Sequence, residues 1–151
     1  MSDYEFTISL RIRHPTIDPR RITDALSREP QHTWQAGEPR RDPEGRGLDG
    51  VYRESYWTGR LMDQPQLSSA ENSVETVLIQ VLDHLRRAHA LLDQLNAEGG
   101  VVELDVSLFS RGSFKLELSP ELVAGFGRLR TAIILDVQPH LPPDTALSQE
   151  P

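Results

Sequence analysis

The feature that most constrains this chain is a run of apolar residues spaced three and four apart between residues 72 and 100. This spacing places them on one face of an α-helix, with glutamine, aspartate and arginine on the other. Asn72 is expected to cap the first turn with Glu75 as its reciprocal partner, and Gly99-Gly100 suits a left-handed exit. Such a helix needs an apolar surface to lie on. The apolar positions are Val74, Val77, Leu78, Val81, Leu82, Leu85, Ala88, Leu92 and Leu95.

Strands with one apolar face are expected to supply that surface. Apolar and polar residues alternate clearly in residues 4–13 and 101–108, as they do in half-buried strands. A turn at 110–113 then predicts a hairpin, and the apolar run at 132–137 indicates a central strand. The expected strands are 4–13, 31–36, 51–62, 101–108, 114–118 and 132–137.

Two shorter helices are marked by their first residues. Asp18-Pro19 gives a cap followed by proline and opens a helix to about Arg28, and Ser119-Pro120 opens another to about Leu129. The segment 37–50 contains four glycines and two prolines and is therefore expected to be a loop.

These elements predict an α+β fold. We expect a mixed β-sheet of about six strands with three helices packed mainly on one face, as a βαββαβ core with a βαβ-type extension. Residues 1–138 would form one domain, and 139–151 a flexible Pro-rich tail. The open face of the sheet would carry the charged residues Arg11, Arg13, Glu103, Asp105, Lys115 and Glu117.

Composition narrows the class of protein. Cysteine is absent, which excludes disulfides and thiolate metal sites. The net charge of −7 disfavours nucleic acid as a partner. The amino terminus has no signal-peptide pattern, and no run approaches the ~20 apolar residues that cross a membrane. We therefore expect a soluble cytoplasmic protein, whose oligomeric state the sequence does not indicate.

No motif predicts a catalytic residue, a metal site or a cofactor. Residues 45–50 match G-x-G-x-x-G, but a strand follows them where a dinucleotide site requires a helix. His84 and His89 lie five apart, too far round a helix to share a metal; His89 is expected in the core and His84 in solvent. Glu103 and Asp105 share a strand face and could bind a cation, although a cross-strand charge ladder is favoured.

A cluster of arginines and aromatic residues between positions 34 and 57 is the candidate binding site. Such residues grip anionic or planar ligands and anchor protein partners. The structural alternative places the tryptophans in the core and pairs the arginines with nearby acids. The candidate residues are Trp34, Arg40, Arg41, Arg46, Tyr52, Arg53, Glu54, Tyr56 and Trp57.

Two hypotheses follow from this cluster. The first is a non-enzymatic binding or interaction module that uses segment 34–57 to contact a protein partner. The second is an enzyme or receptor for an anionic small molecule, in which Arg40, Arg41 or Arg53 holds the charge and Glu54 acts as acid or base.

The same region carries a resemblance to known sequences. Trp34-Gln-Ala-Gly-Glu-Pro-Arg-Arg, Tyr52-Arg-Glu-Ser-Tyr-Trp57, Val102-Glu-Leu-Asp-Val-Ser-Leu-Phe-Ser110 and Leu118-Ser-Pro-Glu-Leu122 resemble a bacterial family catalogued as a domain of unknown function. The resemblance extends over nearly the whole chain up to Val137. It implies no established activity and therefore assigns no catalytic residue.

Overall fold

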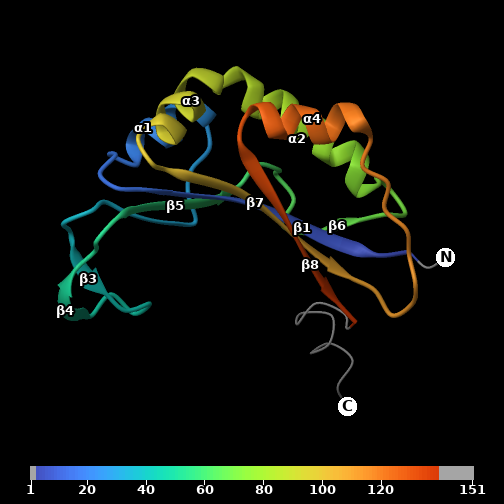
Figure 1. Ribbon diagram of the computed structural model, residues 1–151. Coiled ribbons are helices and arrows are strands. Elements are labelled where there is room, and N and C mark those ends of the chain that lie inside the picture. The colour runs from blue at the N-terminus through green and yellow to red at the C-terminus, as the bar shows by residue number, and fades with distance from the viewer. Residues whose placement is uncertain (1–2, 140–151) are drawn as a thin grey trace, which may run out of the picture.

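A computed structural model describes residues 3–139 of the chain (Figure 1). Of the expected flexible tail, only Pro139 lies within the described residues. In chain order the elements are β1 (Glu5–His14), α1 (Arg20–Leu26), β2 (His32–Trp34), β3 (Pro39–Arg41), β4 (Gly47–Val51), β5 (Ser55–Arg60), β6 (Leu67–Ser68), α2 (Val74–Arg87), α3 (His89–Ala97), β7 (Val101–Phe109), α4 (Pro120–Arg128) and β8 (Thr131–Gln138).

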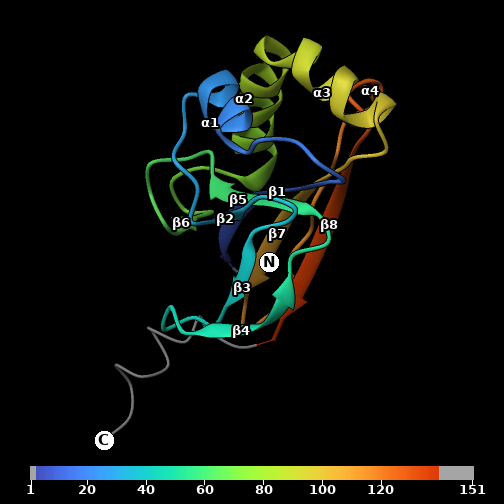
Figure 2. The same ribbon diagram turned by 90° about the vertical axis from the view of Figure 1, so that its left-hand side faces the viewer.

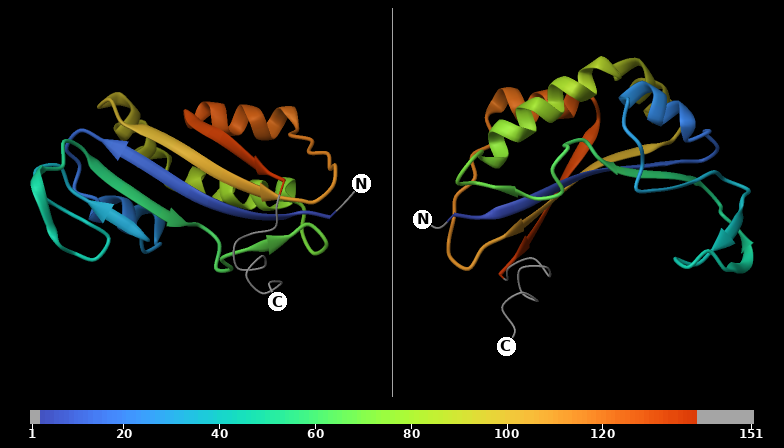
Figure 3. Two further views of the ribbon diagram at one scale, coloured as in Figure 1. Left: turned by 90° about the horizontal axis from the view of Figure 1, so that it is seen from below. Right: turned by 180° about the vertical axis from the view of Figure 1, so that it is seen from behind.

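The main sheet is mixed, six-stranded and covered by helices on one face. Its order is β2-β5-β1-β7-β8, and β6 pairs with the start of β1. Neighbouring strands are antiparallel except β7 and β8, which are parallel because α4 crosses over between them. The helices gather above the sheet and leave the opposite face open (Figures 1 and 3). This confirms the α+β prediction, but with four helices in the described chain where three were expected.

The additional helix arises because the long amphipathic stretch breaks at Ala88. This residue has φ −103° and ψ 20°, which ends α2 and begins α3. Leu85, Ala88 and Leu92 are nevertheless all buried, since both helices lie on the same sheet. Apolar spacing therefore continues across the break, and the sequence gives no signal for it.

The first turn of α2 also differs from expectation. Ser73, and not Asn72, is the cap, and its hydroxyl accepts from the backbone N–H of Thr76 at 3.2 Å. Glu75 does not complete a capping box. Its carboxylate instead accepts a hydrogen bond from the backbone N–H of Glu117 at 3.1 Å. Glu75 therefore ties the start of α2 to the segment that precedes α4.

The core lies between the helices and alternate residues of β1 and β7. In register, Leu10 is opposite Leu104 and Ile12 is opposite Val102, and all four are buried. On the open face, Arg11 binds Asp105 at 2.8 Å and Arg13 binds Glu103 at 3.1 Å. The expected charge ladder is thus confirmed.

One expected strand is absent, and another lies at a different place in the sheet than expected. No strand forms at 114–118, although Phe114, Leu116 and Leu118 are half-buried against the core. The chain passes from β7 into α4 without a hairpin, so Lys115 and Glu117 do not join the charge ladder. The last strand, β8, lies at the edge of the sheet and not at its centre.

The expected loop at 37–50 is a hairpin. Strands β3 and β4 pair as a separate two-stranded sheet, with a register shift between Pro39 and Arg41. All residues of both strands are exposed. Alternation between buried and exposed side chains is therefore absent, which explains why composition alone predicted a loop.

Candidate functional site

The β3–β4 hairpin projects from the open side of the sheet, where it forms an arm that we define as residues 37–54 (Figure 2). Its tip is closed by the Asp42 carboxylate, which accepts from the backbone N–H groups of Glu44 at 3.0 Å and Arg46 at 2.8 Å. Gly45 occupies the left-handed region there, with φ +85°, which favours glycine. The tip is thus an ordered turn.

The base of the arm is fastened by backbone and side-chain hydrogen bonds to Tyr52. Gly37 N–H donates to the Tyr52 carbonyl at 2.8 Å, and Tyr52 N–H donates to the Glu38 carbonyl at 3.0 Å. The Tyr52 hydroxyl accepts from Arg41 N–H at 3.2 Å and donates to the Arg41 carbonyl at 3.3 Å. These bonds hold the two strands at a fixed separation.

Three aromatic rings connect the arm to the sheet. The Trp34 ring lies 4.3 Å from the Tyr52 ring at 11° and 4.5 Å from the Tyr56 ring at 16°. Two rings so close and so nearly parallel cannot share one face of the indole, so Trp34 lies between them. Tyr56 belongs to β5 and Tyr52 to the arm. The stack therefore fixes the arm relative to the sheet, with each pair contributing about 0.5–1.5 kcal/mol beyond its buried area.

The arginines of the arm are not neutralised by its acidic residues. Arg40 donates through Nη1 to the Asp49 carbonyl at 3.3 Å. Within residues 3–139, the guanidinium groups of Arg41, Arg46 and Arg53 form no ion pair. This departs from the structural alternative, in which nearby acids would hold these arginines.

A groove of about 520 Å³ runs between the arm and β2. His32 and Arg41 provide its basic groups, and Trp34 and Tyr52 provide aromatic surface. It is lined by Gln31, His32, Thr33, Trp34, Glu38, Pro39, Arg41, Asp42, Pro43 and Tyr52.

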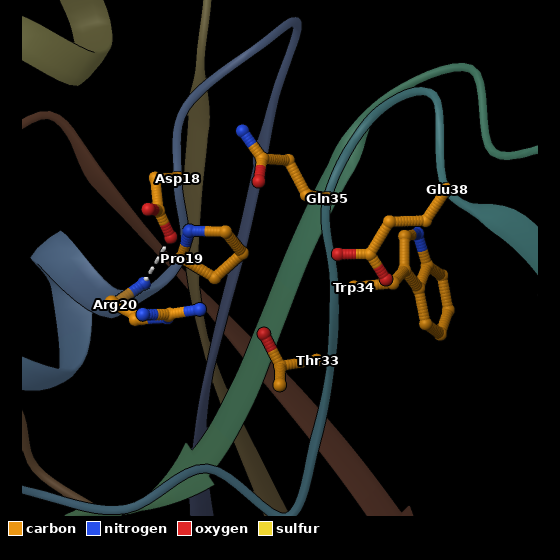
Figure 4. Close-up of a pocket in the computed structure, with 7 residues that line it drawn as sticks. All are labelled: Asp18, Pro19, Arg20, Thr33, Trp34, Gln35 and Glu38. Carbon is orange, nitrogen blue, oxygen red and sulfur yellow. Dashed lines mark hydrogen bonds between the residues drawn. The ribbon is translucent and has the colours of Figure 1, made fainter.

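A smaller hollow of about 180 Å³ shares Thr33, Trp34 and Glu38 with this groove. In Figure 4 the Arg20 guanidinium and the Glu38 carboxylate point into it from opposite sides. Asp18 accepts from the backbone N–H of Arg20 at 3.0 Å, which fixes the start of α1 at the rim. Charges of both signs therefore face the hollow.

Not every candidate residue belongs to this site. Trp34, Tyr52 and Tyr56 are brought together, and the arm carries Arg40, Arg41, Arg46, Arg53 and an exposed Glu54. Trp57 lies elsewhere: it is fully buried in the core, and its Nε1 donates to the Thr23 hydroxyl at 3.0 Å.

Three residues that line these hollows, His32, Asp18 and Arg20, were not predicted as site residues from the sequence. His32 lies two residues before Trp34 on β2. Because side chains two apart on a strand share one face, this spacing could have placed His32 beside the aromatic stack. Asp18 and Arg20 approach the site only through the fold, so their positions in the chain carry no such signal.

The remaining candidate groups have structural partners. His84 contacts the Leu26 carbonyl at 2.7 Å and is half-buried, whereas His89 is exposed near Asp93, so the expected environments of these two histidines are reversed. Residues 3–139 contain no group of three histidine or carboxylate side chains placed to hold a metal.

A comparison with known protein families identifies the family of this chain. A family model described as Domain of unknown function (DUF4279) matches residues 4–140. The chain belongs to the DUF4279 family. Searches of the curated proteins and of the solved structures found no match for it. None of the described helices of this DUF4279 domain is long and apolar enough to cross a membrane.

Proposed function

We propose that this DUF4279 domain is a non-enzymatic binding module and that the arm is its recognition element. The observation that carries the proposal is the arm itself, a projecting hairpin braced by the Trp34 stack. It presents Arg41, Arg46 and Arg53, which form no ion pair with any other described residue. A hairpin held in place before binding loses less conformational freedom when a partner arrives.

The chemistry of the arm fits a protein surface. Arginine and aromatic side chains supply much of the binding energy at protein interfaces. Leu48 and Val51 add exposed apolar area, at 45% and 53%. The partner surface would therefore offer carboxylates around an apolar patch, since guanidinium groups bind carboxylates with two parallel hydrogen bonds.

A second candidate function is a receptor for an anionic small molecule. The observation that favours it is the groove, whose lining includes His32, Arg41 and the aromatic side chains of Trp34 and Tyr52. Such a site would hold an anionic group on the arginine, next to the aromatic side chains.

Site-specific photo-cross-linking in cells of the source organism tests the proposed function. A photoreactive phenylalanine analogue would replace Leu48 on the arm, which is 45% exposed. As a matched control it would replace Ile79 on α2, which is 53% exposed. We expect a protein adduct at position 48 and none at position 79. Arg41→Ala with Arg46→Ala should reduce the adduct at least ~10-fold, since truncating a hot-spot arginine costs more than about 1 kcal/mol and two such losses exceed the ~1.4 kcal/mol that corresponds to tenfold.

Arg87→Ala is the control for the charge change, because Arg87 is an exposed arginine on α2 at the helical side of the molecule. The absence of an adduct at position 48, or equal adducts with and without the two arginines, would contradict the proposal. Stabilisation by inorganic phosphate or citrate that is lost in Arg41→Ala alone would instead support the small-molecule receptor.

A further inference from the structure

The two edges of the main sheet are built differently. One edge consists of β2, with three residues, and β6, with two. The other edge is β8, which has eight residues and pairs with β7 without interruption from Val102↔Thr131 to Phe109↔Gln138. Within the described chain no strand lies beyond β8 (Figure 3).

The outward-facing backbone groups of β8 follow from a single hydrogen bond. Ser110 N–H donates to the Gln138 carbonyl at 3.3 Å, so the polar backbone groups of Gln138 face β7. Successive residues of a strand direct these groups to opposite sides. Thr131, Ile133, Leu135 and Val137 therefore direct their N–H and C=O groups away from the sheet, toward solvent.

This edge carries few of the devices that normally prevent strands from pairing. Sheet edges are usually protected by charged side chains, above all lysine, by proline, by a bulge or by very short strands. The sequence of β8, Thr-Ala-Ile-Ile-Leu-Asp-Val-Gln, contains no proline or lysine and one charged residue, Asp136, and its register has no bulge. Leu135 and Val137 are exposed at 43% and 58%. The edge thus offers both unpaired backbone groups and apolar side chains.

We infer that β8 pairs antiparallel with β8 of a second copy of this chain, which joins two sheets into one across a two-fold axis. A strand added to a free edge gains backbone hydrogen bonds along its whole length. With Ile134 at the axis, Thr131 faces Val137 of the second copy and Ile133 faces its Leu135. All four outward-facing residues then find partners, and the apolar side chains cover one another.

Charge complementarity favours a second copy of this chain as the partner that pairs with the β8 edge. Arg130 precedes β8 and is exposed, and Asp136 lies near the end of the strand. In the paired arrangement Arg130 is diagonal to Asp136 of the second copy, within reach of a long side chain. The two-fold axis produces this contact twice. The helical layers of both copies would lie on one side of the joined sheet, and both arms on the other.

Sedimentation equilibrium of the full chain tests the inference. We expect a dimer whose dissociation constant rises at least ~10-fold in Leu135→Lys, because lysine at an edge opposes strand pairing. Arg130→Glu and Asp136→Arg should each weaken the dimer through facing like charges, and combining them should restore it. Positions 130 and 136 are six residue steps apart, or ~20 Å along a strand, so a rescue of this kind acts between copies.

Circular dichroism and melting temperature would verify that each variant folds. Ala132→Lys provides a matched control, because Ala132 is also an exposed residue of β8 but its backbone groups face β7 and its side chain lies on the open face. We expect it to weaken the dimer less than Leu135→Lys does. A monomeric wild-type chain, or a dimer indifferent to Leu135→Lys and to both charge reversals, would overturn the inference.

Discussion

His14 holds the end of β1 through a fixed pattern of hydrogen bonds. Its buried ring accepts at Nδ1 from the N–H groups of Thr16 at 3.0 Å and Ile17 at 2.9 Å. The proton therefore lies on Nε2, which donates to Glu98 at 2.8 Å. This side chain links the turn after β1 to the end of α3. The sequence predicted a strand that ends at residue 13 and no role for His14, since the contact with Glu98 joins positions far apart in the chain.

The pH dependence of stability should reveal the Glu98 contact. Hydrogen bonds from Gln94 and then His14 hold the pKa of Glu98 below its ordinary value of 4.5. The unfolded state therefore binds more protons, and the stabilisation is present above about pH 4.5 and lost as pH falls through the folded value. We expect Glu98→Gln to lower the melting temperature at pH 7, with a difference that shrinks below pH 4.5. A difference independent of pH would contradict this, and Glu71→Gln is an exposed control.

At the scale of elements, the packing of α2 against α4 depends on one close contact, between Gly125 and Leu82. A Cβ added at Gly125 would lie 2.4 Å from Cδ2 of Leu82, a buried residue of α2. At Gly127, in the same helix, an added Cβ would meet nothing within 4 Å. Glycine at position 125 therefore permits the two helices to pack closely.

Alanine substitutions at these glycines should have opposite effects. Gly127→Ala should raise the free energy of unfolding by about 0.5–1 kcal/mol, because alanine favours the helix. Gly125→Ala should lower it by about 1–2 kcal/mol, because overpacking exceeds that gain. Urea titration measures both changes. Equal stabilisation by both substitutions would show that Leu82 moves freely and would contradict the tight contact.

Sequence periodicity predicted the elements that have one buried face. Strands β1 and β7 alternate cleanly, and the Ser119-Pro120 start of α4 is confirmed by the Ser119 hydroxyl, which accepts from Leu122 N–H at 3.1 Å. Where burial is not one-sided the prediction failed. The exposed arm strands resemble a loop in composition, and the half-buried residues from Phe114 to Leu118 alternate without pairing.

The aromatic residues of the candidate site were predictable from the sequence, but their arrangement was not. Trp34, Tyr52 and Tyr56 attracted attention because aromatic residues are few in this chain, but their stacking depends on the pairing of β2 with β5. Trp57 has the same composition signal and a different role. Its place on the alternate face of β5, beside buried Ser55, directs it into the core.

The molecule as a whole consists of a helix-covered sheet from which a braced arm projects (Figure 1). The sheet provides the rigid base, and the Trp34 stack holds the arm in a fixed position on it. The exposed arginines would otherwise stand on a mobile hairpin, because an isolated two-stranded hairpin is only marginally stable in water. The proposed function therefore depends on the stack at the base of the arm.

Amide hydrogen exchange in the wild type and in Trp34→Ala tests this dependence most directly. We predict that the amides of Gly37 and Tyr52, which bond across the base of the arm, are protected in the wild type. In Trp34→Ala their protection should fall while that of the β1 and β7 amides is unchanged. Arm amides that exchange freely in the wild type, or that keep full protection without the indole, would contradict the account.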